Sequence, residues 1–143
     1  MGGVGGAPGP RRPGARVTVQ VFGFRDCQDT RKALRFFAER RVAVQFVDLA
    51  VRPASRGELR RFHERLGAAA LIDRERRRFR ELGLHVAGDS PERLLERALA
   101  EPRILRTPLV RCGQQVAVGH APETWGAWLA AAGARGPSGR PAG

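Results

Sequence analysis

The stretch that decides the fold is V-T-V-Q-V-F-G-F-R-D-C-Q-D-T-R-K, residues 17–32. Its first part, residues 17–22, alternates apolar and polar side chains and is rich in β-branched residues, which predicts a strand. From Asp29 to Arg41 the apolar side chains recur at helical spacing, which predicts a helix. Cys27 lies in the loop between the two, at the end of a strand where open α/β sheets place their ligand sites.

The next elements follow from local signals. Residues 42–49 read as a second strand, so the order strand, helix, strand implies a right-handed parallel crossover. Ser55 and Glu58 form a capping box, which predicts a helix over 56–66. Two more helices are expected, at 75–82, stopped by Gly83, and at 91–100, where Ser90 caps and Pro91 takes the first position.

Extended segments return near the end of the folded part. Residues 105–110 and 115–118 are expected strands, and residues 111–114 between them are expected to form a tight turn. A last helix over about 122–132 carries Trp125 and Trp128 on one face. The whole order, β-α-β, helices, β-β-α, predicts an α/β, thioredoxin-like fold with a mixed four-stranded sheet and a helical insertion between its halves.

Composition sets the limits of the domain. Residues 1–15 and 134–143 are rich in Gly, Pro, Ala and Arg and are expected to be disordered tails, which leaves one domain over 16–133. No apolar run approaches the roughly 20 residues that span a bilayer, and residues 1–16 do not resemble a secretory signal. A cytoplasmic protein without a membrane partner is therefore expected.

The net charge of +12 raises the question of a polyanionic partner. Nearly every cation is arginine, with Lys32 the only lysine, so the bias of a GC-rich genome explains the charge as readily as a binding surface. The chain has no tyrosine and few aromatic residues suited to stacking on bases. Nucleic-acid binding is accordingly not expected.

Cys27 is the one candidate nucleophile. The positive end of the following helix and the nearby Arg25, Arg31 and Lys32 favour a thiolate, whereas two aspartates of the loop oppose it. Thr30 completes a Cys-x-x-Thr arrangement whose hydroxyl could donate to the sulfur. The alternatives are a small filler at a turn for the cysteine and an ordinary helix-start residue for the threonine.

The other residues with ligand chemistry are scattered. The second cysteine, Cys112, forms neither a CxxC pair nor a Cys/His cluster of zinc spacing with any neighbour, and the three histidines lie far apart in the sequence. Neither a structural metal nor a bound cofactor is expected.

A family resemblance covers residues 17 to 130. The chain resembles the arsenate reductase/Spx-like (ArsC) family of thioredoxin-fold proteins, which are bacterial. The segments that carry the likeness are the opening strand and cysteine loop over 19–34, V-D-L at 47–49 with Pro53 and residues 55–59, F-R-E-L-G-L at 79–84, residues 101–110, V-A-V-G at 116–119 and P-E-T-W at 122–125.

The resemblance implies a site. It makes Cys27 the catalytic thiol, assisted by Thr30 and Arg31, and it places Arg25, Arg106, Thr107 and Pro108 at the substrate. It also implies a cis Thr107–Pro108 bond facing the thiol, where the alternative is a plain trans proline at a strand start.

The chain departs from the family pattern where an oxyanion would bind. Arsenate reductases of this family use arginines for that purpose, but the arginine of the family's Arg-Pro step is Thr107 here and Arg106 is displaced by one residue, toward the opposite face. The arginine expected near residues 71–72 falls on Asp73, although Arg74 and Arg76 are close. A third arginine, which some family members place before the last helix, falls near Gly119 or His120 in this chain. These departures argue against arsenate reduction itself.

Spx-type regulators generally use a CxxC switch, and Thr30 stands where the second cysteine would be. Cys112 lies four positions beyond Pro108, about 13 Å along a strand, which is too far for a disulfide with Cys27. Any disulfide is therefore expected to be intermolecular, with glutathione or a partner protein.

Three functions stay open at this point. The first is a monomeric thiol oxidoreductase with glutathione as co-substrate and a small thiol or glutaredoxin-like protein as partner. The second is an Spx-like, non-catalytic regulator whose basic surface binds an acidic partner such as an RNA polymerase subunit. The third is a diverged family member that has lost its activity.

Overall fold

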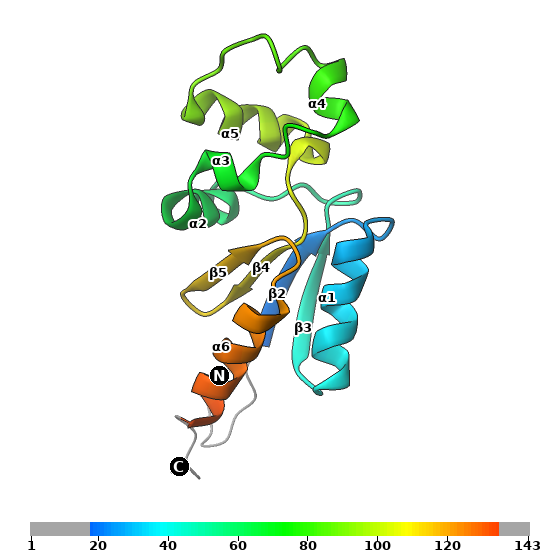
Figure 1. Ribbon diagram of the computed structural model, residues 1–143, viewed down its shortest axis with the longest axis vertical. Helices are drawn as coiled ribbons and strands as arrows, with labels where there is room; N and C mark the ends of the chain where they lie inside the picture. The colour runs from blue at the N-terminus through cyan, green and yellow to red at the C-terminus, as the bar shows by residue number, and fades with distance from the viewer. Residues whose placement is uncertain (1–17, 135–143) are drawn as a thin grey trace, which may run out of the picture.

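The computed structural model describes residues 18–134. A four-stranded sheet in the order β3-β2-β4-β5 forms its centre, and its strands and helices are arranged as Figure 1 shows. The elements in chain order are β2 (Thr18–Gly23), α1 (Gln28–Glu39), β3 (Ala43–Asp48), α2 (Arg56–Leu66), α3 (Ala68–Leu71), α4 (Arg77–Glu81), α5 (Pro91–Ala100), the 3₁₀ helix η1 (Pro102–Ile104), β4 (Leu109–Cys112), β5 (Gln115–Val118) and α6 (Pro122–Ala134).

The sheet is mixed, as the sequence predicts. β2 pairs in parallel with β3 through the α1 crossover and antiparallel with β4, and β4 pairs antiparallel with β5. The α/β, thioredoxin-like class with a helical insertion is therefore confirmed, because α2 to α5 lie between the βαβ and ββα halves in the chain.

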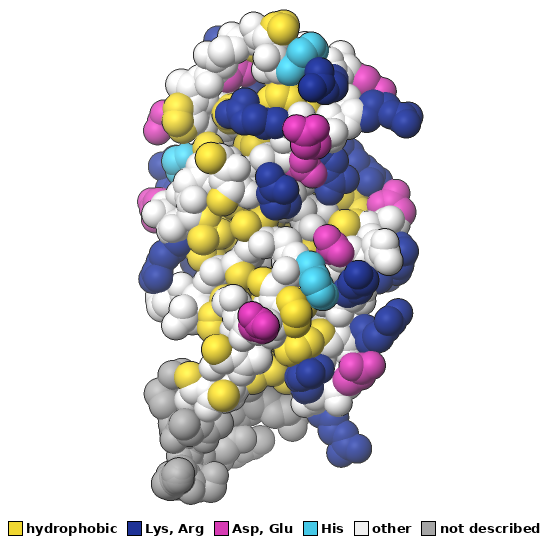
Figure 2. Space-filling model, in the orientation of Figure 1, with side chains coloured by type: hydrophobic (Ala, Val, Ile, Leu, Met, Phe, Trp, Pro, Cys, Tyr) yellow, Lys and Arg dark blue, Asp and Glu magenta, His cyan; other side chains and the backbone are white. Residues whose placement is uncertain are grey.

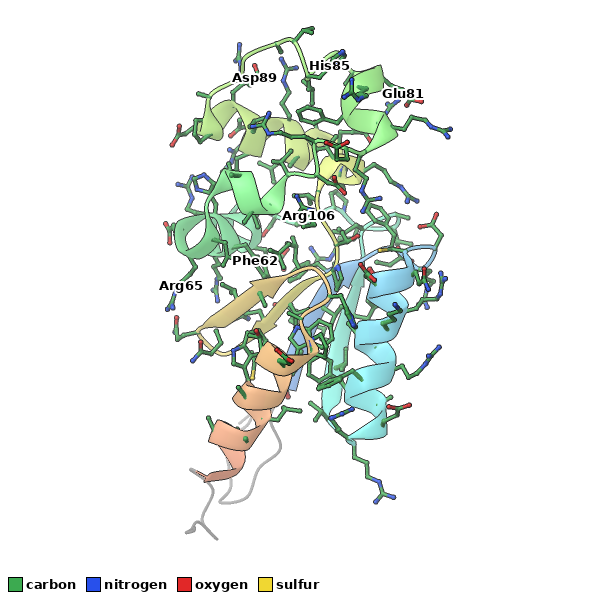
Figure 3. The ribbon with its side chains drawn as sticks, in the orientation of Figure 1. Phe62, Arg65, Glu81, His85, Asp89 and Arg106 are labelled. Carbon is green, nitrogen blue, oxygen red and sulfur yellow. The ribbon has the colours of Figure 1, made fainter. Side chains whose placement is uncertain are left out.

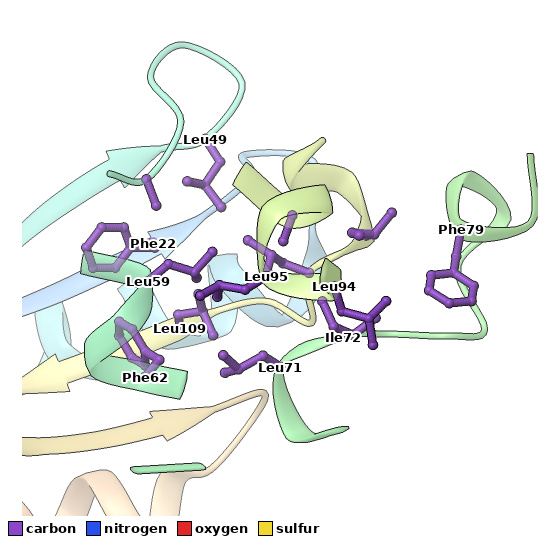
Figure 4. Close-up of a cluster of buried hydrophobic side chains, with 14 of the residues drawn as sticks. Phe22, Leu49, Leu59, Phe62, Leu71, Ile72, Phe79, Leu94, Leu95 and Leu109 are labelled. Atoms are coloured by element: carbon purple, nitrogen blue, oxygen red, sulfur yellow. The ribbon is translucent and has the colours of Figure 1, made fainter. Parts of the chain in front are cut away.

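Successive side chains of β2 point to opposite faces of the sheet, and the buried core forms one cluster on each face. Val19 and Val21 pack with α1 and α6, in a cluster centred on Phe37 and Trp125. Phe22 has the opposite orientation and joins the larger cluster under the inserted helices. Figure 4 shows this larger cluster, with side chains from β2, α2, α3, α4, α5 and β4 in contact.

Two predicted helix starts are confirmed at the level of hydrogen bonds. Ser55 Oγ accepts from the Glu58 amide at 3.1 Å, and Glu58 Oε1 accepts from the Ser55 amide at 2.8 Å, so the capping box is complete. Ser90 Oγ accepts from the Arg93 amide at 3.2 Å, with Pro91 in the first turn. These contacts explain why both helices begin where the sequence places them.

The strand after the insertion differs from its prediction. The expected strand over 105–110 is instead Leu109–Cys112, and the turn is confined to residues 113–114. Leu105 makes an isolated bridge to Ile72, because this part of the chain packs on the helical insertion before it reaches the sheet. The predicted tails lie outside the described residues, except that Ala134 still belongs to α6.

Candidate active site

Cys27 sits at the N-terminus of α1, as the loop in the sequence predicts. Its amide donates to the carbonyl of Phe24 at 3.0 Å, and its own carbonyl accepts from the Arg31 amide at 3.1 Å as the helix begins. The residue occupies the N-cap position with extended backbone angles, and its side chain makes no capping hydrogen bond. The thiol is half-buried against the larger core cluster.

Thr107 brings the other half of the sheet to the thiol. The Thr107 hydroxyl donates to Cys27 Sγ at 3.2 Å, and the protonated thiol can donate to the Thr107 carbonyl at 3.9 Å. The Thr107–Pro108 bond is cis, which confirms the expectation from the family resemblance. Thr107 is only 3% exposed, so water has little access to its hydroxyl.

These contacts act on the pKa of Cys27. Burial of the thiol acts to raise its pKa, but the hydrogen bond from the Thr107 hydroxyl, the dipole of the nearby Thr30 hydroxyl and the amides of Thr30 and Asp29 together outweigh it. The pKa of Cys27 therefore lies below that of an ordinary cysteine. A thiol with a lowered pKa that retains partial exposure is the form expected of a nucleophile.

Thr30 is placed where the sequence predicts, one helical turn beyond Cys27, but it contributes less than Thr107. The side chain is fully buried, and its Oγ1 has no hydrogen-bond partner of regular geometry among residues 18–134. Its influence on the thiolate is therefore that of a nearby dipole, not of a formed bond. The hydroxyl packs closely on Gly23, at the end of β2.

The arginines predicted at the site are engaged in other contacts. Arg106 donates to the carbonyls of Ala70 and Ile72, at 3.2 and 3.4 Å, and so holds the inserted helices (Figure 3). Arg25 pairs with Asp48 at 3.3 Å. Arg31 donates to the Arg25 carbonyl at 2.8 Å, which supports the loop. None of these four contacts is with the Cys27 sulfur.

The loop before Cys27 is fastened to the insertion by an ion pair that the sequence does not reveal. Arg103 donates twice to the Asp26 carboxylate, at 3.0 and 3.2 Å, and its guanidinium lies 3.8 Å from the centre of the Phe24 ring. The hydrogen bond from Arg103 lowers the pKa of Asp26. Asp26 is thereby paired with a cation, which reduces the repulsion that it would exert on the thiolate.

Arg76 is the residue that sequence reasoning did not assign. It lies just before α4, and its Nη2 donates to Thr107 Oγ1 at 3.1 Å, the same hydroxyl that donates to Cys27. Asp73 pairs with Arg76 through Oδ2 and Nε, 3.3 Å apart. The only signal in the sequence was the shift of an expected arginine from the region of residues 71–72 to a position a few residues later.

Residues 18–134 contain neither a candidate metal site nor a membrane-spanning helix. Among residues 18–134, no cluster of three or more His, Cys, Asp or Glu side chains could hold a metal ion. Within the same range, each helix is too short or too polar to cross a bilayer.

Comparison with known proteins identifies similar chains. The model of the ArsC family matches residues 22–128. A comparison with the sequences of curated proteins finds no match. Among solved structures, the chain is similar to the YFFB (PA3664) protein, with 27% identity, a TM-score of 0.72 and coverage of 78% of this chain and 98% of the other.

Two further structures share the fold. An arsenate reductase from Vibrio cholerae has 23% identity and a TM-score of 0.68, with 76% of this chain and 95% of the other covered. A putative arsenate reductase from Yersinia pestis has 22% identity and a TM-score of 0.67, with 75% and 96% covered. The matched part of this chain thus corresponds to nearly the full length of all three proteins.

Proposed function

Because this chain belongs to the ArsC family, we propose that it is a thiol oxidoreductase that reacts through Cys27 alone and exchanges disulfides with glutathione or a protein thiol. The family supports a thiol-based role in general. The choice of a single cysteine and of a disulfide substrate is supported by the residues around the sulfur.

The observation that carries the proposal is the contact between the Thr107 hydroxyl and Cys27 Sγ, at 3.2 Å, from the opposite half of the sheet. A donor in this position stabilises the thiolate, the form that attacks a disulfide. The second cysteine takes no part, because Cys112 packs in the cluster of α1 and α6 whereas Cys27 packs under the inserted helices.

The proposed step is a thiol–disulfide exchange with glutathione disulfide as the oxidant. The Cys27 thiolate attacks one sulfur of the disulfide, a Cys27–glutathione bond forms, the original S–S bond breaks, and the second glutathione leaves as a thiolate that takes a proton from water. A second thiol, from glutathione or a glutaredoxin-like protein, then attacks the glutathione sulfur of the adduct and releases Cys27 as a thiolate.

The arginines favour a disulfide over an arsenate ion as the substrate. An oxyanion in the site would need guanidinium groups to hold it. Arg106 bonds to backbone carbonyls and Arg25 to Asp48, while Thr107 stands at the position of the family's arginine before the cis proline. A neutral sulfur of a disulfide needs no such clamp.

The direct test is adduct formation. We expect the reduced full-length protein, incubated with glutathione disulfide, to gain the mass of one glutathionyl group per chain, located on Cys27 by peptide mass spectrometry. Cys27→Ser should abolish this adduct. Cys112→Ser is the matched control, because it removes the other thiol and should leave the yield unchanged.

Two results would contradict the proposal. One is an adduct that forms on Cys112 and persists in Cys27→Ser, which would indicate ordinary exposure of a thiol. The other is the absence of any adduct on the wild-type protein over a range of glutathione disulfide concentrations.

The lowered pKa gives a second expected result. The rate at which iodoacetamide alkylates Cys27 follows the fraction of thiolate, so it should reach half its maximum below pH ~8.5, the value for an unperturbed cysteine. Peptide mass spectrometry across a pH series measures this rate for Cys27 separately from Cys112. A midpoint at or above that of a short cysteine peptide in the same buffers would refute the activation of Cys27.

The Spx-like alternative requires a basic face for an acidic partner. On the face that Figure 2 shows, Lys and Arg side chains are interspersed with Asp and Glu. Several arginines of the inserted helices pair with carboxylates, among them Arg78 with Glu81 and Glu101, and Arg97 with Asp89. These pairs reduce the charge available for docking, and we retain the oxidoreductase as the proposed function.

A further inference from the structure

Three side chains form a continuous polar chain that ends at the reactive sulfur. Asp73 Oδ2 lies 3.3 Å from Arg76 Nε, Arg76 Nη2 lies 3.1 Å from Thr107 Oγ1, and Thr107 Oγ1 lies 3.2 Å from Cys27 Sγ. The four residues come from three separate segments: the turn before α4, the approach to β4 and the start of α1.

The direction of these hydrogen bonds is fixed by chemistry. A guanidinium group only donates, so the contact with Arg76 must use a lone pair of Thr107 Oγ1. A hydroxyl carries one hydrogen, and with Arg76 in place that hydrogen is directed away from the guanidinium. The sulfur of Cys27 is the acceptor in this direction, and the burial of Thr107 keeps water from competing for the hydrogen.

We propose that Arg76 is a positioning residue for Cys27: it occupies the accepting side of the Thr107 hydroxyl and so commits that hydroxyl to donate to the sulfur. The proposal deepens the proposed function, since it rests on Cys27 reacting as a thiolate. It also accounts for two of the three departures from the family pattern. Thr107 replaces an arginine next to the thiol, and Arg76 supplies a guanidinium behind it, anchored by Asp73 where the family has another arginine.

A hydroxyl next to the sulfur has a different effect on substrate choice from a guanidinium group in the same place. The group in contact with the thiolate is a neutral hydroxyl, so the thiolate is stabilised without an additional cation that would attract an oxyanion. The Arg76 side chain is 27% exposed, forms an ion pair with Asp73 and donates a hydrogen bond to Thr107.

The test measures alkylation of Cys27 by iodoacetamide as a function of pH, on the reduced full-length protein with peptide-level detection. Arg76→Ala should move the profile to higher pH and slow the reaction about tenfold at a pH below the midpoint, as expected for loss of one hydrogen bond to a charged group. Thr107→Val should have at least the same effect. The matched control is Arg74→Ala, which removes an equal charge two residues away and should leave the profile unchanged.

The double variant decides whether Arg76 acts through the hydroxyl. In the Thr107→Val background, Arg76→Ala should have almost no further effect, because the group that it orients is gone. Arg76→Lys, which keeps a charged donor, should recover part of the wild-type rate. Asp73→Asn is a second, milder variant that should move the profile in the same direction, and thermal unfolding of each variant verifies that it is folded.

Two outcomes would overturn the inference. An equal slowing by Arg76→Ala with and without Thr107→Val would mean that its charge acts through space, and this slowing would also fade with added salt. An unchanged profile for both Arg76→Ala and Asp73→Asn would mean that the hydroxyl needs no positioning. If wild-type protein forms no glutathione adduct but Arg76→Ala still shifts the profile, the proposed function fails and this inference stands.

Discussion

Trp125→Ala should lower the free energy of unfolding by about 3–5 kcal/mol, the range for removing a large aromatic side chain from a core. Trp125 is fully buried on α6, and its ring centre lies 5.3 Å from that of Phe36 and 5.5 Å from that of Phe37, both on α1. It therefore joins the first and last helices of the fold across one face of the sheet. Urea unfolding followed by circular dichroism measures the loss.

Trp125→Phe is the graded control for this prediction. The indole Nε1 of Trp125 is buried and has no hydrogen-bond partner among the described residues, so phenylalanine removes an unsatisfied donor along with part of the ring. Its cost should be well below that of alanine. The alkylation profile of Cys27 should change little in the folded Trp125→Phe protein, because the thiol packs in the other cluster. Equal unfolding midpoints for wild type and Trp125→Ala would show that α6 is not part of the cooperative unit.

The elements that the sequence predicts accurately are those whose signals are local. The helix Arg56–Leu66 has both residues of its capping box within four positions, and Pro91–Ala100 has its cap and proline adjacent. The short helix Ala68–Leu71 and the 3₁₀ turn Pro102–Ile104 escape prediction. They are too short to show a periodic pattern, and packing on neighbouring helices determines their formation.

The residues of the site were likewise predictable only where their signal lies close by in the sequence or in the family resemblance. Cys27 can be found from its place between a strand and a helix, and the cis proline from the family resemblance. Arg76 cannot, because its contact with Thr107 joins residues 31 positions apart, on the insertion and on the approach to β4. The same is true of the Asp26–Arg103 pair, which spans 77 positions. Spacing along the chain carries no information about such contacts when the connecting segment is an irregular run of short helices.

The second large effect is expected at Gly23, where β2 meets the cysteine loop. A Cβ added to Gly23 would lie 2.3 Å from Thr30 Oγ1 and 2.7 Å from its Cγ2, far inside van der Waals contact. Thr30 is fully buried, so the side chain has no open space in which to move. The start of α1 must shift away from the strand, and Cys27 lies within one turn of that point.

We therefore expect Gly23→Ala to lower the free energy of unfolding by about 1–3 kcal/mol, as overpacking of a core does, and to slow alkylation of Cys27. Thr30→Ala removes both atoms that clash, so it should restore much of the stability when combined with Gly23→Ala, although it costs some stability alone. A double-mutant cycle by urea unfolding measures this coupling. Additive losses would mean that the start of α1 can move away from β2 without a loss of stability. The close contact between Gly23 and Thr30 would then not be what holds the thiol in place.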